Sequence, residues 1–178
     1  MNDWKTKSSK VVHKNPRFSV REDGVITPNG RDAVFYVIDR PSVVFIIPLT
    51  RDNEVYLIHL SRYFTKKSNW EIPAGSSDNQ DELSAAKREL KEETGLVSKD
   101  WSKLGELEVA AGMTGQMSHV FVAKDVKLTK ENEKAEEGID DMKKVSFKEV
   151  LQMIENEEIV NGPSMAALML AGLKLKLF

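Results

Sequence analysis

Three glutamates stand close together in the segment Arg88–Leu96. Glu89, Glu92 and Glu93 have the spacing i, i+3, i+4, so in a helix they fall within an arc of about 100°. Like charges this close repel one another unless a positive group lies between them, and a hard divalent cation with oxygen ligands would remove that cost. The spacing therefore predicts a metal site. The alternative is a solvated acidic helix face paired with Arg88 and Lys91.

The helix that carries these glutamates is predicted over residues 81–94. Leu83, Ala86, Leu90 and Val97 share one apolar stripe, which should face the core. The carboxylates lie beside this stripe, at the edge of the core. Gly95 is expected to end the helix, because glycine accepts the left-handed conformation common at this position.

The rest of the chain predicts strands before this helix, strands after it, and two helices at the end. A capping box at Ser146 opens a helix to about Glu155, and Gly162 opens the last one. This order predicts an α/β or α+β sandwich. The expected strands cover residues 18–20, 25–27, 33–38, 42–49, 54–60, 101–111 and 117–126, and a polar loop is expected over 130–141.

Composition limits the possible functions. The 178 residues suit one domain with a sizeable core, and 40% apolar with 30% charged residues is an ordinary globular balance. A formal net charge of -2 gives no basic field for nucleic acid. The chain has no cysteine, which excludes disulfides, thiolate zinc sites and cysteine nucleophiles.

The two ends of the chain carry no sign of a membrane or of secretion. The basic residues between Lys5 and Arg17 are expected to form a solvated, partly frayed tail without an apolar signal region. The apolar run Met165–Leu173 is too short to span a bilayer. We therefore expect a cytoplasmic protein with no membrane partner and no nucleic-acid partner.

The segment Arg88–Leu96 resembles the second half of the Nudix hydrolase box, Arg-Glu-apolar-x-Glu-Glu-x-Gly-apolar, at every fixed position. The first half departs, since Gln80 stands at a glutamate position and Gly75 is one residue too near. Trp70–Gly75 resembles the segment before the box in ADP-ribose and nucleoside-diphosphate-sugar pyrophosphatases. Gly112–Gln116 is similar to a loop of the same branch.

This resemblance implies a Nudix α/β/α sandwich with a mixed sheet over residues 41–178. It also implies a small N-terminal antiparallel β-segment over residues 1–40. Such N-terminal strands are commonly exchanged between subunits in the family, so a homodimer is implied, with the β-segment in its interface.

The resemblance also assigns metal ligands. Mg²⁺ or Mn²⁺ would be held by the Ala74 carbonyl, Glu89, Glu92 and Glu93, and Glu93 is also a catalytic candidate. Gly75 would let the backbone expose the neighbouring carbonyl in a tight turn. Arg88 is expected to brace the loop through the acids, with a phosphate contact as the alternative.

Further residues are implied as catalytic or substrate-binding. Glu136 and Glu137 are the candidates for the general base, with a solvated charged loop as the alternative reading. Arg62 and Glu71 would contact diphosphate and base or ribose, and Met113 lies in the branch-like loop. Phe35 and Tyr36 are candidates to stack on the base, although core or interface roles are favoured for both, and only one of the two can face the ligand. His59 and His119 are expected to pack.

The function implied is metal-dependent hydrolysis of the diphosphate bond of ADP-ribose or a nucleoside diphosphate sugar. The products would be a nucleoside monophosphate and a sugar phosphate. Rival substrates within the family are dinucleoside polyphosphates, nucleoside triphosphates and coenzyme A. A non-catalytic Nudix domain that senses a nucleotide is the alternative from a different class, and the glutamine at position 80 leaves room for it.

Overall fold

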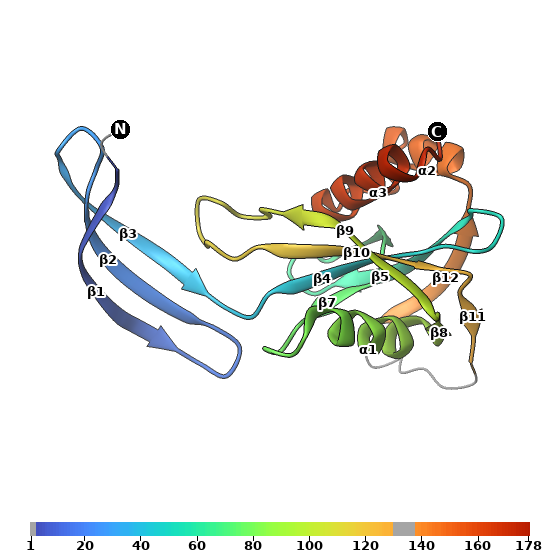
Figure 1. Ribbon diagram of the computed structural model, residues 1–178, viewed down its shortest axis with the longest axis horizontal. Helices are drawn as coiled ribbons and strands as arrows, with labels where there is room; N and C mark the ends of the chain where they lie inside the picture. Colours follow the sequence, from blue (N-terminus) through green and yellow to red (C-terminus); the bar gives the residue numbers. More distant parts are fainter. Residues whose placement is uncertain (1–2, 130–137) are drawn as a thin grey trace. The chain divides into compact units, whose positions relative to one another are not determined.

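The computed structural model describes residues 3–129 and 138–178. The chain forms two compact units (Figure 1). The first comprises Met1–Pro41 and Glu108–Met117, and the second comprises Ser42–Leu107 and Ser118–Phe178. A loop from the middle of the chain therefore belongs to the N-terminal unit.

The first unit is a three-stranded antiparallel sheet of β1 (Lys5–Lys14), β2 (Ser19–Ile26) and β3 (Asp32–Asp39), in that order. The prediction of a frayed tail over the basic N-terminus was wrong, because β1 pairs with β2 along its length. All side chains of β1 are exposed, so its stability comes from the backbone ladder with β2. The two short strands expected over 18–27 form one continuous strand.

The second unit holds two main sheets. One has the order β7-β4-β10-β9, with β4 parallel to β10 and the other pairs antiparallel, so the predicted mixed sheet is confirmed. The other has the antiparallel order β12-β5-β6. The strands of these sheets are β4 (Val43–Pro48), β5 (Val55–Arg62), β6 (Lys67–Glu71), β7 (Ala74–Ser76), β9 (Asp100–Leu107), β10 (Ser118–Lys124) and β12 (Ile139–Val145). Two short strands, β8 (Leu96–Val97) and β11 (Lys127–Leu128), pair with each other.

Three helices complete this unit: α1 (Glu82–Thr94), α2 (Phe147–Glu155) and α3 (Gly162–Leu175). Helix α1 lies on one side of the sheets, and α2 and α3 lie on the other (Figure 1). The predicted α/β/α sandwich is therefore confirmed. None of the helices in the described part of the chain has the length and apolar character needed to cross a bilayer.

Helix α1 begins and ends where its sequence predicts. The Asp81 carboxylate accepts a hydrogen bond from the Ser84 backbone N–H at 2.9 Å, which caps the N-terminus. Gly95 takes φ 70°, and its N–H donates to the Lys91 carbonyl. Val97 was wrongly placed on the apolar stripe, because the helix has ended and this residue is exposed in β8.

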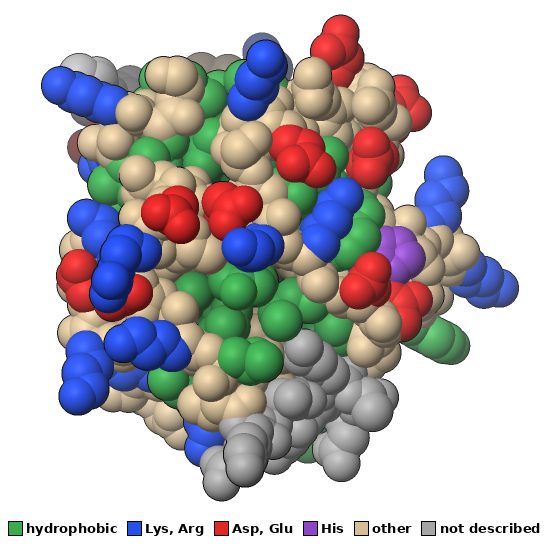
Figure 2. Space-filling model, turned by 90° about the vertical axis from the view of Figure 1, so that its right-hand side faces the viewer, with side chains coloured by type: hydrophobic (Ala, Val, Ile, Leu, Met, Phe, Trp, Pro, Cys, Tyr) green, Lys and Arg blue, Asp and Glu red, His purple; other side chains and the backbone are tan. Residues whose placement is uncertain are grey.

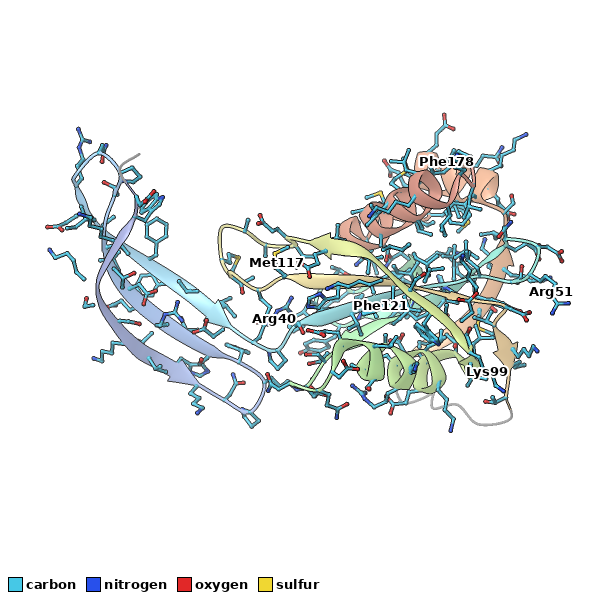
Figure 3. All side chains as sticks on the ribbon, in the orientation of Figure 1. Arg40, Arg51, Lys99, Met117, Phe121 and Phe178 are labelled. Carbon is cyan, nitrogen blue, oxygen red and sulfur yellow. The ribbon has the colours of Figure 1, made fainter. Side chains whose placement is uncertain are left out.

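The core under α1 joins the helix to β4 and β10. Ala85, Ala86 and Leu90 pack on Val44 and on Phe121, which lies inside the second unit (Figure 3).

The expectation of a loop over 130–141 was wrong for residues 139–141, which belong to β12 and pair with β5. On the face of the molecule in Figure 2, acidic and basic side chains are interspersed.

Candidate active site

Glu89 packs directly on the backbone of Gly75. A Cβ atom added at residue 75 would lie 2.0 Å from Cδ of Glu89 and 2.2 Å from each carboxylate oxygen. Gly75 lies in β7, opposite Val44 of β4, and not in a tight turn. The glycine is thus required by the close approach of a carboxylate to the strand, a different reason from the one expected.

Glu93 is joined to the same strand one residue earlier. Its Oε2 accepts a hydrogen bond from the Ala74 backbone N–H at 2.9 Å, and the side chain is buried. The structure therefore brings two of the predicted acids, one helical turn apart, to two consecutive residues of β7. The carbonyl proposed as a further ligand belongs to one of these residues.

Arg88 lies between Glu89 and Glu92. Its guanidinium contacts Glu89 Oε1 at 2.9 Å and Glu92 Oε2 at 2.8 Å, and it donates to the Ser76 carbonyl at 2.9 Å. Partial burial lowers the pKa of Arg88, but the carboxylates of Glu89 and Glu92 outweigh this effect, so the net shift is upward. Arg88 thereby supplies positive charge between two acids and ties α1 to the segment after β7.

The described residues contain no group of three acidic or histidine side chains gathered tightly enough to enclose an ion. Mg²⁺ does not require such a group, because it commonly uses one or two protein carboxylates and completes its shell with water and substrate phosphates. Glu89, Glu92 and Glu93 offer hard carboxylate oxygens, and β7 offers a backbone carbonyl at Ala74. This set of donors fits a hard divalent cation.

Arg62 and Glu71 form a two-pronged ion pair on neighbouring strands. Arg62 Nε donates to one oxygen of Glu71 at 3.1 Å, and Nη2 donates to the other at 2.6 Å. The Glu71 side chain is only 3% exposed, whereas that of Arg62 is 46% exposed. The buried acid therefore fixes the direction of a guanidinium that still reaches the surface.

The first unit contains an apolar cavity of about 300 Å³. Phe35 lies on the same strand face as Asp23, its partner in β2, and its ring packs edge-on against Trp4 at 5.3 Å. Tyr36 points to the opposite face, where it is hydrogen-bonded to Glu22, and this bond raises the pKa of Tyr36. The cavity is lined by Trp4, Asp23, Val25, Phe35, Tyr36, Val37 and Ala111–Gly115.

This cavity includes Trp4, which the sequence alone did not single out, and Met113, which the resemblance to a family loop had suggested. Trp4 precedes β1, in a segment that was expected to be a frayed tail. Met113 lines the cavity because its backbone is held next to β3: its carbonyl accepts a hydrogen bond from the Ile38 N–H at 2.8 Å. No local sequence pattern predicts the contacts that Trp4 and Met113 make at the cavity, because both contacts depend on the pairing of segments that are distant in the chain.

The remaining candidates are distributed as follows. Glu136 and Glu137 lie outside the described residues. His59 packs against Trp70, with ring centroids 5.0 Å apart, and its Nδ1 lies 2.6 Å from Asp140 Oδ1. His119 is buried in β10.

The chain is similar to known protein families and to a solved structure. The family described as NUDIX domain matches residues 39–168. The family described as nucleoside diphosphate sugar hydrolase N-terminal domain matches residues 4–38. A solved structure described as an ADP compounds hydrolase has a TM-score of 0.84, covers 98% of this chain and 95% of its own, and is 22% identical.

Three curated proteins are also similar. An ADP-ribose pyrophosphatase of Mycobacterium tuberculosis is 28% identical over 172 residues, covering 94% of this chain and 83% of that protein. An ADP-ribose pyrophosphatase of Bacillus subtilis is 24% identical over 177 residues, with 96% of each chain covered. A methanol dehydrogenase activator of Bacillus methanolicus is 28% identical over 166 residues, with 92% of this chain and 89% of that protein covered.

Proposed function

This chain belongs to the Nudix family, and from that premise we propose that it hydrolyses the diphosphate bond of ADP-ribose or a related nucleoside diphosphate sugar. The products would be a nucleoside monophosphate and a sugar phosphate. The observation that carries the proposal is the seating of two acids of one helix, Glu89 and Glu93, on consecutive residues of β7. The match of the N-terminal strands to the nucleoside-diphosphate-sugar family and the names of two relatives favour this substrate class.

The residues proposed to hold Mg²⁺ or Mn²⁺ are Ala74, Glu89, Glu92 and Glu93. When bound, the ion would neutralise diphosphate oxygens and lower the pKa of a water molecule. Arg88 keeps Glu89 and Glu92 in place despite their like charges. A proton acceptor is also needed, and we assign it to Glu136 or Glu137, with a solvated loop as the alternative.

Arg62 would bind the diphosphate. Its guanidinium is oriented by the buried Glu71 and keeps part of its surface exposed to solvent. A guanidinium held in this way can donate two parallel hydrogen bonds to phosphate oxygens with little further loss of side-chain entropy. Glu71 would then serve the substrate through Arg62, since hydrogen bonds from Arg62 engage both of its oxygens.

The cavity of the N-terminal unit would take the base of the nucleotide. Its volume of about 300 Å³ and its aromatic wall suit a flat, heteroaromatic ring. The strand register favours Phe35 over Tyr36 as the stacking residue. By family resemblance, the protein would act as a homodimer through its N-terminal strands.

A substrate panel tests the proposal. The purified protein is incubated with ADP-ribose, a nucleoside diphosphate sugar, a dinucleoside polyphosphate, a nucleoside triphosphate and coenzyme A, with Mg²⁺ or Mn²⁺, and products are separated by chromatography. We expect a nucleoside monophosphate and a sugar phosphate from the first two. Cleavage of triphosphates alone would reject the proposed substrate class, and no cleavage of any diphosphate would reject the enzyme.

A further inference from the structure

A buried histidine lies between two carboxylates at the opposite end of α1 from Glu93. His119 is 8% exposed. Its Nε2 lies 3.5 Å from Glu82 Oε1, and its Nδ1 lies 3.3 Å from Glu106 Oε1. Glu82 belongs to the first turn of α1 and Glu106 to β9, so the imidazole connects the helix to the sheet.

The position of His119 in the sheet relates it to Gly75. Strand pairing places Gly75 opposite Val44, Val44 opposite His119, and His119 opposite Glu106. Residues directly opposite one another in neighbouring strands share a face, and strands lie about 4.8 Å apart. His119 therefore stands two strands from Gly75, roughly 10 Å away on the face that α1 covers.

Helix α1 carries a row of acidic residues whose spacing matches that of Gly75, Val44 and His119 on the sheet. At about 100° per residue, Glu89 and Glu93 lie about 20° to either side of Glu82. Glu89 follows Glu82 by seven positions in the helix, a rise of about 10.5 Å. The row of acids on α1 thus has the spacing of the row on the sheet. Glu82 contacts His119, Ala86 packs with Val44, and Glu89 contacts Gly75.

We propose that His119 is a positioning residue for the hydrolytic centre: by holding Glu82, it fixes the rotation of α1 that seats Glu89 and Glu93 on β7. Ala85, Ala86 and Leu90 hold α1 on the sheet by apolar packing, which is non-directional, and a turn of one residue about the helix axis would move both acids away from the strand. The contact at Glu82 opposes this turn. The link to catalysis rests on the proposed function, whereas the link between His119 and α1 does not.

The charges around His119 support a bridge. The groups that face it are Glu82 from α1 and Glu106 from β9, and Lys103 of β9 is paired with Glu106 at 2.6 Å. The hydrogen bond from Lys103 lowers the pKa of Glu106, with a smaller contribution from His119. Within the described chain, Nδ1 of His119 is buried without an aligned hydrogen bond.

Two substitutions test the bridge. Glu82→Gln removes the charge of a partly exposed side chain and should not prevent folding. The side-chain amide in His119→Gln can still donate a hydrogen bond, but it lacks the two ring nitrogens that lie near Glu82 and Glu106. We expect each to raise the Mg²⁺ concentration for half-maximal activity by about 10-fold, as for residues that orient metal ligands, with the KM for ADP-ribose little changed. The double variant should be no worse than the worse single variant, because both substitutions remove the same contact between Glu82 and His119.

Backbone amide hydrogen exchange without metal provides a second measurement that is independent of activity. We expect faster exchange in the first half of α1 for Glu82→Gln. The matched control is Glu54→Gln, which breaks the exposed pair with Lys144 at 2.8 Å and should leave α1 unchanged. Unchanged exchange in α1, an unchanged Mg²⁺ requirement in an active enzyme, or additive losses in the double variant would overturn the proposal. Lack of hydrolysis by the wild-type protein would reject the proposed function alone, because the exchange result still decides whether His119 holds the helix.

Discussion

The carboxylate of Glu89 occupies the space that a side chain at residue 75 would fill, so the acid of one helix and the glycine of one strand are fitted to each other. The sequence alone does not indicate that these two residues are in contact, because 13 residues lie between them along the chain. In the fold they are in contact.

Gly75→Ala should displace Glu89 and impair activity. The new methyl group would meet the carboxylate at 2.0–2.2 Å, so the side chain must leave β7. We expect about a 10–100-fold loss of kcat/KM with a raised Mg²⁺ requirement. Gly162→Ala is the matched control, because a Cβ there meets nothing within 4 Å. Equal activity of the two variants would show that the position of Glu89 is unimportant.

Glu93→Gln should lose turnover and keep the fold. The amide oxygen can still accept the hydrogen bond from the Ala74 N–H, but the negative charge is gone. We expect kcat to fall by about 10²–10⁴-fold with a melting temperature within a few degrees of wild type. Kinetics and calorimetric binding of ADP-ribose are measured together, with the exposed Glu155→Gln as control. A wild-type protein that binds ADP-ribose without cleaving it would favour a sensor.

Glu71→Gln should act on substrate binding through Arg62. The amide cannot accept both hydrogen bonds from the guanidinium, so Arg62 loses its fixed direction. We expect the KM for ADP-ribose to rise by about 10-fold with a smaller change in kcat, since 1.4 kcal/mol of binding corresponds to this factor. Arg62→Lys should have a similar effect, because an ammonium group cannot form the fork. A KM effect for Glu71→Gln without one for Arg62→Lys would contradict the role of the pair.

Phe35→Ala should weaken recognition of the base. Its ring borders the cavity and packs against Trp4, whereas Tyr36, which also borders the cavity, directs its side chain to the other face of β3. Loss of one stacked ring is worth about 1 kcal/mol beyond the buried area, so KM should rise by roughly 5–10-fold. Tyr36→Ala is the matched control from the same strand. If Tyr36→Ala raises KM and Phe35→Ala does not, the assignment of the two faces is wrong.

Asp81→Ala should destabilise α1 in a pH-dependent manner. The hydrogen bond from the Ser84 backbone N–H lowers the pKa of Asp81 below its ordinary value of 3.8. A lowered carboxyl pKa means that the stabilisation is complete above pH 3.8 and is lost as pH falls through the lower folded-state value. We expect a melting temperature about 2–4 °C lower at pH 7 and a difference that shrinks under acid. A constant difference across this range would exclude a role for the charge.

The sequence by itself determined the helix of the box, its ends and its acidic face. Its i, i+3, i+4 pattern and Gly95 are local signals, and local backbone preferences act on them directly. The order of elements also predicted an α/β or α+β sandwich, and the resemblance to the Nudix family implied its mixed sheet. In contrast, strand β1 carries no buried residue, so its sequence has no apolar alternation, and only pairing with β2 makes it a strand.

Only the tertiary structure decided which partner each polar side chain receives. It placed Arg62 on Glu71, Glu93 on Ala74 and His119 between Glu82 and Glu106, and it assigned Phe35 and Tyr36 to opposite faces. These relationships depend on strand register and on the rotation of α1, which are set by packing between segments far apart in the chain. Residue types and spacing predicted the chemistry of the site, and the packing of α1 on the sheet decided its geometry.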